Sequence, residues 1–188
     1  MYEYISGKLA SLTAATAVVD CGGVGYLLEI SLSTYSAIQE KEEVKLWVHE
    51  VIREDAYLLY GFYAPAEREM FRMLLGVNGV GAATARMMLS SLSVEELTNA
   101  IASQDVKMVQ RVKGVGAKTA QRIVLELQDK VSSFGVTVAA PAMNRNKEEA
   151  LSALVMLGFP KVAADKVLQK LDGKLSVEEL IKESLKSL

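Results

Sequence analysis

One short pattern occurs twice in this 188-residue chain, at residues 77–85 and 112–120, which lie 35 positions apart. Each copy reads Val-x-Gly-Val-Gly-Ala and lies between two apolar stretches with helical spacing. Two glycines separated by one residue let the backbone turn sharply and approach a phosphate, because no Cβ stands in the way. The residues that follow begin a helix, whose unpaired N–H groups and positive dipole end attract anions. The pattern predicts a tandem helix-hairpin-helix module that holds DNA by its backbone without reading its sequence.

The two copies also agree beyond the glycines, since Thr84 aligns with Thr119 and Ala85 with Ala120. A purely structural helical repeat is the alternative interpretation. Neither copy fits a nucleotide-binding loop, because Ala82 stands where such a loop needs lysine and no third glycine follows. We predict that DNA is bound by Asn78, Gly79, Val80, Gly81, Arg86, Lys113, Gly114, Val115, Gly116, Lys118, Thr119 and Arg122.

The net charge of −2 is unevenly distributed along the chain. Residues 1–63 carry four basic and nine acidic side chains, whereas residues 64–130 carry nine basic and seven acidic ones. The basic excess therefore falls on the hairpins. Because this excess is small, we expect affinity to depend on backbone amides, a few cations and the multiplication of sites by oligomerisation.

Composition limits the cellular setting. The hydrophobic content of 51% favours an oligomer, because it exceeds what a small monomer must bury. The single cysteine, Cys21, excludes an intrachain disulfide, and Glu3 stands where a signal peptide would be basic. No run of eighteen apolar residues occurs, so we expect no membrane segment and a cytoplasmic location.

The first segment, residues 1–63, has the pattern of β-structure. Five strand-length runs rich in β-branched and aromatic residues occupy residues 4–12, 15–20, 26–32, 44–51 and 56–62. Five short strands in about sixty residues predict a small barrel of the OB type. Two interpretations fit the aromatic residues of this segment: they stack on single-stranded bases, or they pack in the core. The acidity of the segment favours core packing. These residues are Tyr26, Trp47, Tyr57, Tyr60 and Phe62.

From residue 64 onward the spacing becomes helical. Pro65 suits the first turn of a helix to about residue 75, and Ser93 and Glu96 form a capping box for a helix through residue 102. Residues 64–131 are thus expected to form the hairpin domain. Residues 132–146 lose periodicity and predict a flexible linker, and residues 147–188 fit three short helices with a capping box at Ser176. Leu154, Leu157 and Phe159 form either a docking face for a partner or merely this small core.

In all three segments the chain resembles the RuvA family of bacterial Holliday-junction recognition subunits. The most specific stretches are GGVGY at 22–26, REDA at 53–56 followed by LLYGF at 58–62, the two hairpins, and ALVMLGF at 153–159. It departs from the pattern at Ala83 and Ala117, where many members carry lysine, and at Lys113, where proline or another apolar residue is common.

The resemblance implies an α+β multidomain chain: an OB barrel, a double helix-hairpin-helix domain and a UBA-like three-helix bundle. It implies a homotetramer, sometimes an octamer, that holds a four-way junction open and flat. The C-terminal bundle would contact RuvB, a hexameric ATPase that drives branch migration in recombination and repair, and the assembly would cooperate with RuvC, a junction resolvase. Glu54 and Asp55 match an acidic pin at the tetramer centre. The resemblance implies no catalytic residue, metal or cofactor in this subunit.

Two other function classes compete with this interpretation. One is a generic single-strand or structure-specific DNA-binding adaptor that uses the OB barrel. The other is a helix-hairpin-helix glycosylase or nuclease, in which Lys113 or Lys118 would attack a sugar. No carboxylate cluster for a metal is evident and the single histidine, His49, falls in a predicted strand, so the sequence disfavours an enzyme.

Overall fold

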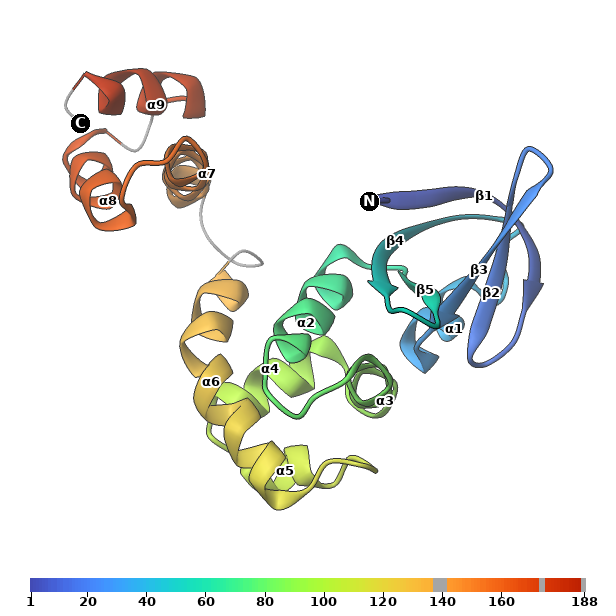
Figure 1. The fold of residues 1–188 in the computed structure, drawn as a ribbon. Coiled ribbons are helices and arrows are strands. Elements are labelled where there is room, and N and C mark those ends of the chain that lie inside the picture. The colour runs from blue at the N-terminus through green and yellow to red at the C-terminus, as the bar shows by residue number, and fades with distance from the viewer. Residues whose placement is uncertain (137–141, 173–174, 187–188) are drawn as a thin grey trace. The chain divides into compact units, whose positions relative to one another are not determined.

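The computed structural model describes residues 1–136, 142–172 and 175–186 (Figure 1). The chain divides into two compact units, Met1–Ser132 and Ser133–Leu188. Among the described residues, the strands and most of the helices lie in the first unit, and the last three helices lie in the second.

Five strands of the first unit close into a barrel. They are β1 (Tyr4–Leu12), β2 (Thr16–Cys21), β3 (Val24–Ile30), β4 (Glu43–Ile52) and β5 (Tyr57–Phe62). The order around the barrel is β1-β2-β3-β5-β4, and β4 returns to pair with β1. Only β3 and β5 are parallel among these pairs, with Leu28 opposite Leu59. The predicted OB-type barrel is confirmed.

Alternate residues of the strands fill the barrel. The buried set from three strands is Ala17, Val19, Leu28, Ile30, Val44, Leu46 and Val48. This spacing of two follows from the pleat of a strand, which sends successive side chains to opposite faces. Tyr60 and Phe62 are also buried, whereas Tyr57 is exposed. Tyr60 and Phe62 therefore pack in the core, which was one of the two roles that the sequence allowed for the aromatic residues.

A short helix, α1 (Leu32–Ile38), connects β3 and β4. The sequence predicted a strand to residue 32 and no helix here. The helix begins where the Ser31 hydroxyl accepts a hydrogen bond from the Thr34 N–H, 3.0 Å away. Ser31 therefore marks the end of the strand and the start of the helix, and a serine at this position is the local sequence signal for such a helix start.

The helices of the first unit are α2 (Pro65–Leu75), α3 (Ala82–Ser91), α4 (Val94–Ala102), α5 (Val106–Gln110) and α6 (Ala117–Val136). The predicted Pro65 start of α2 and the Ser93 capping box of α4 are both present. Helix α2 packs against the barrel through Phe71, which is fully buried. The Phe71 ring lies 4.9 Å from that of Phe62 and 5.0 Å from that of Tyr60, between ring centroids.

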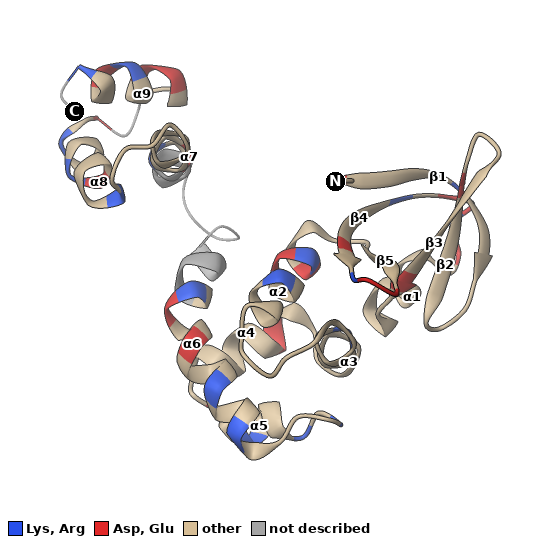
Figure 2. Ribbon diagram, viewed as in Figure 1, with Lys and Arg blue, Asp and Glu red and all other residues tan. Residues whose placement is uncertain are grey.

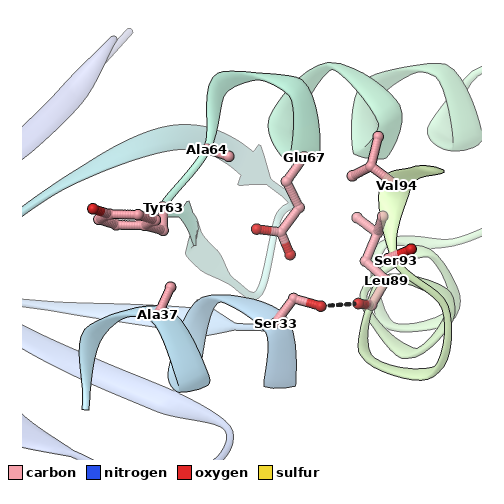
Figure 3. Close-up of a pocket in the computed structure, with 8 residues that line it drawn as sticks. All are labelled: Ser33, Ala37, Tyr63, Ala64, Glu67, Leu89, Ser93 and Val94. Atoms are coloured by element: carbon pink, nitrogen blue, oxygen red, sulfur yellow. Dashed lines mark hydrogen bonds between the residues drawn. The ribbon is translucent and has the colours of Figure 1, made fainter. Parts of the chain in front are cut away.

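A buried carboxyl lies beside this contact. Glu67 of α2 accepts hydrogen bonds from the hydroxyls of Ser31 and Thr34, the latter at 2.7 Å. It lines a cavity of about 170 Å³ between α1 and the first turns of α2 and α4 (Figure 3). Burial raises the pKa of the Glu67 carboxyl above its usual value, and the two hydroxyl donors oppose this rise.

The second unit contains α7 (Ala142–Met156), α8 (Lys161–Lys170) and α9 (Val177–Leu185). Its buried core consists of Ala150, Leu154, Ala164, Leu168 and Leu180. The predicted capping box between Ser176 and Glu179 is present at the start of α9.

The structure differs in part from the flexible linker expected at residues 132–146. Residues 132–136 continue α6 and residues 142–146 begin α7, while residues 137–141 lie outside the described residues. Extending a helix that has already formed adds one hydrogen bond for each residue fixed, so lost amphipathic periodicity need not end it. Among the described residues, no helix combines the length and apolar character needed to cross a bilayer.

Candidate nucleic-acid interface

The two repeated turns have the same backbone geometry. The N–H of Val80 donates to the Val77 carbonyl at 3.0 Å, and that of Val115 donates to the Val112 carbonyl at 3.1 Å. The first glycine of each pair lies in the left-handed region, with φ of 91° at Gly79 and 90° at Gly114. A side chain there would be strained, so glycine sets the shape of both turns.

The second glycine of each pair leaves space above a helix start. Gly81 has an extended backbone and precedes α3, and no side chain caps that helix. A Cβ at Gly81 or Gly116 would meet no heavy atom within 4 Å. An anion can therefore approach the first N–H groups of α3 and α6, where the helix dipoles favour negative charge.

The valines of each turn anchor it. Val80 and Val115 are each 6% exposed, and Val77 and Val112 are also buried. Their side chains hold the turn against its two helices, while the intervening Asn78, Gly79, Lys113 and Gly114 are exposed. Val80 and Val115 can therefore offer a phosphate only their backbone atoms.

The two hairpins touch each other. Arg122 of α6 donates from Nη1 to the Asn78 carbonyl of the first turn at 3.1 Å. A Cβ at Gly79 would lie 3.9 Å from Thr119 Oγ1, which places the start of α6 beside the first turn. The structure thus brings together the predicted DNA contacts of both copies.

The cations of the second hairpin are exposed. Lys113 and Lys118 form no ion pair with any described residue. Arg111 is also exposed and was not predicted, although it stands two positions before Lys113. Basic residues gather at α5 and the start of α6 (Figure 2). Phosphates would meet positive charge mainly at the second hairpin.

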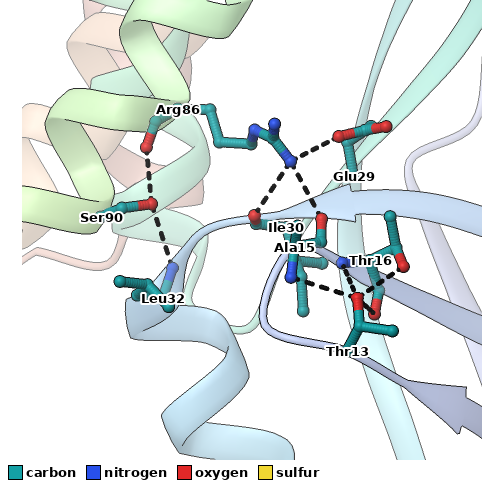
Figure 4. Close-up of polar contacts among 8 residues, drawn as sticks. All are labelled: Thr13, Ala15, Thr16, Glu29, Ile30, Leu32, Arg86 and Ser90. Atoms are coloured by element: carbon teal, nitrogen blue, oxygen red, sulfur yellow. Dashed lines mark hydrogen bonds and ion pairs between the residues drawn. The ribbon is translucent and has the colours of Figure 1, made fainter.

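Arg86 is placed differently from the other predicted DNA contacts. Its Nη1 lies against the Glu29 carboxylate of β3 and donates to the Ala15 carbonyl at 2.9 Å (Figure 4). Its side chain is 25% exposed. The guanidinium is therefore engaged with the barrel and not with the hairpin turns.

The acidic pair lies at the tip of the barrel. Glu54 and Asp55 are exposed in the turn between β4 and β5, which the Arg53 N–H closes by donating to the Ala56 carbonyl at 2.8 Å. The turn stands out in red in Figure 2. Both carboxylates point a negative charge into solvent, which suits repulsion of phosphate.

The predicted docking residues of the second unit separate. Leu154 is fully buried in the three-helix core and Phe159 packs against that core, whereas Leu157 is 63% exposed. Leu154 is thus a core residue, since it lies one helical turn from the buried Ala150. The exposed apolar side chains near the α7–α8 turn are Val155, Met156, Leu157 and Val162, which we call the α7–α8 patch.

Two observations bear on the metal-binding residue types and the single histidine. No group of three or more His, Cys, Asp or Glu residues there could hold a metal ion. His49 packs edge-on against Phe71, with 5.4 Å between ring centroids. Burial and then the nearby Arg72 and Arg68 lower the pKa of the His49 imidazole.

Comparison with known proteins gives one consistent result. Family models match at residues 1–61 (RuvA N terminal domain), 71–129 (SAM-like helix-hairpin-helix tandem) and 145–188 (RuvA, C-terminal domain). A protein of Bacteroides thetaiotaomicron named Holliday junction branch migration complex subunit RuvA is 47% identical over the full length of both chains. The chain belongs to the RuvA family. Proteins with that name from Christiangramia forsetii and Flavobacterium psychrophilum are 47% and 44% identical, also over both full lengths.

Membership in the RuvA family agrees with the geometry of the first two segments. The barrel occupies the part that matches the RuvA N-terminal domain, and both glycine turns lie in the part that matches the helix-hairpin-helix tandem. The relatives are named as subunits of a Holliday junction branch migration complex.

Proposed function

We propose that this chain is the subunit that binds four-way DNA junctions in a branch migration complex, in the cytoplasm. The observation that carries the proposal is the pair of matching glycine turns, joined by the bond from Arg122 to the Asn78 carbonyl. Each turn offers open helix N-terminal amides, and the two together can hold successive phosphates of one duplex arm.

The domains have separate roles in this proposal. Residues 1–63 form the assembly and junction-centre domain, residues 64–131 bind DNA, and residues 147–188 bind the motor. The DNA contacts are the predicted set without Arg86, whose guanidinium is engaged by Glu29. Arg122 acts by holding the first turn, and Lys113 and Lys118 supply charge.

We infer that four copies surround the junction, as a homotetramer or as an octamer of two tetramers. Exposed apolar side chains on the barrel support self-association, among them Leu27, Ile52 and Tyr57. In a fourfold assembly the Glu54 and Asp55 turns would gather as a central pin. One carboxylate repels one phosphate by about 0.4 kcal/mol at ~10 Å in water, so many pairs reach a few kcal/mol.

The motor partner is proposed to be a hexameric ATPase of the RuvB type, docked on the α7–α8 patch. Met156 and Leu157 are 86% and 63% exposed there, and a marginal three-helix unit gains by covering such side chains. A RuvC-type resolvase would act on the same junction.

Competitive binding to a four-way junction, a linear duplex and a single strand of matched sequence tests the proposal. We expect strong preference for the junction at every salt concentration, independent of arm sequence. Equal affinity for all three would instead indicate a generic adaptor. Preference for the single strand would indicate that the exposed aromatic residues of the barrel bind bases.

A further inference from the structure

We propose that Arg86 is a positioning residue: its contact with Glu29 and Ala15 fixes the first hairpin at one angle to the barrel, and this angle gives the protein its preference for junctions. The inference rests on the proposed function. It removes Arg86 from the phosphate contacts and assigns it a mechanical role.

The first hairpin is held to the barrel on both of its sides. On one side α2 is packed against β4 and β5 through Phe71. On the other side three residues on one face of α3 make polar contacts with the barrel domain. Arg86 meets Glu29 and the Ala15 carbonyl, Ser90 Oγ accepts from the Leu32 N–H at 3.1 Å, and the Leu89 carbonyl accepts from Ser33 Oγ at 2.9 Å.

Hydrogen bonds within the barrel domain hold the Ala15 carbonyl, which accepts from Arg86, in place. Thr13 Oγ1 accepts hydrogen bonds from the N–H groups of Ala15 and Thr16, at 3.2 and 3.0 Å, and so shapes the turn between β1 and β2 (Figure 4). That turn presents the Ala15 carbonyl, which also accepts from the Ile30 N–H at 2.9 Å. Both Arg86 and Glu29 are less than one third exposed, so their pairing is screened less than a surface ion pair.

These contacts form a continuous connection from the barrel to both DNA-binding turns. Arg86 lies five residues after Gly81, on the helix whose first amides face the phosphate. Arg122 then ties the first turn to α6 and the second hairpin. A change at Arg86 therefore alters the direction of both turns relative to the acidic turn of the barrel, while each turn keeps its own shape.

Junction preference depends on this direction. A duplex needs only one correctly shaped hairpin pair, whereas a junction must engage several sites at once, and that multiplication disappears when the geometry forbids simultaneous contact. The positioning role therefore affects the ratio of junction affinity to duplex affinity. A phosphate-contact role would affect both affinities together.

The variants Arg86→Gln and Glu29→Gln separate the two roles. Matched controls are Arg72→Gln, which removes an arginine paired with Glu69 within one helix, and Glu40→Gln, which removes an exposed barrel carboxylate. Affinities for a four-way junction and a linear duplex are measured at several salt concentrations, and circular dichroism verifies the fold. Energy transfer between dyes on two junction arms reports the arm angle in the complex.

If Arg86 positions the hairpin, Arg86→Gln lowers the junction-to-duplex ratio about tenfold and changes the arm angle, with duplex binding nearly unchanged. Glu29→Gln causes a smaller loss in the same direction, because its amide oxygen still accepts. Should Arg86→Gln fail to fold, the isosteric Glu29→Gln decides alone. Control variants are expected to match wild type.

Three results would overturn the inference. Wild-type ratios in both variants would show that the contact is only structural. Tighter binding of Glu29→Gln to junction and duplex alike would show that Glu29 withholds Arg86 from phosphate. A wild-type protein without junction preference would overturn the proposed function and the inference with it, whereas the first two results leave the proposed function intact.

Discussion

At the scale of single residues, the four hairpin glycines have two different roles. Gly79 and Gly114 have positive φ and shape the turns, whereas Gly81 and Gly116 lie beside open space at the helix starts. The sequence shows four equivalent glycines. Only the backbone angles distinguish the pair that shapes the turns from the pair that we propose admits a phosphate.

The glycine pairs give a direct test. Gly81→Leu and Gly116→Leu should fold normally but weaken junction binding about tenfold or more each, because a side chain blocks hydrogen bonds to a charged group worth about 1.5–3 kcal/mol. Gly79→Ala should instead destabilise the fold by about 1–2 kcal/mol. Urea unfolding and gel-shift titration measure the two effects. Undiminished junction affinity in the leucine variants would restrict these glycines to shaping the fold.

Glu67 predicts a pH-dependent stability. Its folded pKa is raised, so above the ordinary carboxyl pKa the folded state holds more protons than the unfolded state. The contribution of Glu67 to stability is therefore fully present below pH ~4.5 and is lost as pH rises through the folded pKa. As pH rises through this window, the free energy of unfolding of Glu67→Gln should increase relative to that of wild type. Urea titrations between pH 4 and 7 measure the difference. Parallel curves would contradict the raised pKa.

At the scale of elements, the proposed DNA-binding helix starts differ between the two hairpins. Helix α3 has Ala83 at the position that Lys118 occupies in α6, 35 residues later. In the proposed interface the first hairpin therefore offers amides alone at this position, and the second adds a cation. The two turns have the same shape, so a substitution at Ala83 can test this difference in charge.

Ala83→Lys should strengthen DNA binding by adding a phosphate contact. Because Ala83 is exposed in the first turn of α3, the slope of log affinity against log salt should become steeper by about 0.9 for duplex DNA. Asn99→Lys, at an exposed position of α4, adds the same charge away from both turns. Salt titrations of both variants make the comparison; equal slopes would place Ala83 outside the DNA contact.

The acidic turn between β4 and β5 has its own prediction. Replacing Glu54 with Gln and Asp55 with Asn removes the repulsion of phosphate, so junction binding should stay the same or become tighter. The rate of branch migration with the motor present should change. Neutralising Glu42 and Glu43, an exposed acidic pair elsewhere in the barrel domain, is the control. Unchanged migration kinetics would remove the turn from the mechanism.

At the scale of the whole molecule, local patterns predicted more than long-range contacts. The strands of the barrel, the two turns and the capping boxes at Ser93 and Ser176 followed from spacing, because each depends on neighbouring residues; the number and length of the strands then indicated the barrel. The partner of Arg86 is Glu29, 57 residues away, and no local pattern connects them. The sequence could have assigned Leu154 to the core, since Ala150 precedes it by one helical turn. Leu157 lies just past the end of α7, so helical spacing does not predict which way its side chain faces.

The α7–α8 patch predicts how the second unit meets its partner. Met156→Glu and Leu157→Glu should abolish stimulation of a RuvB-type ATPase while junction binding persists, because exposed apolar side chains at this turn contribute no core packing. Leu185→Glu, at the end of α9, is a matched control, and Leu154→Ala should instead destabilise the unit by about 2–5 kcal/mol. ATP hydrolysis assays with the motor and thermal melting measure these effects. Retained stimulation in both patch variants would move the docking face elsewhere.

The closed barrel also limits how copies of this chain can join. Every strand in it has a hydrogen-bonded neighbour on both sides, so no strand offers a free edge along its whole length to a strand from another molecule. Association along the paired part of the barrel therefore uses side chains. Such association changes with single side-chain substitutions, unlike the pairing of exposed strand edges that builds fibres.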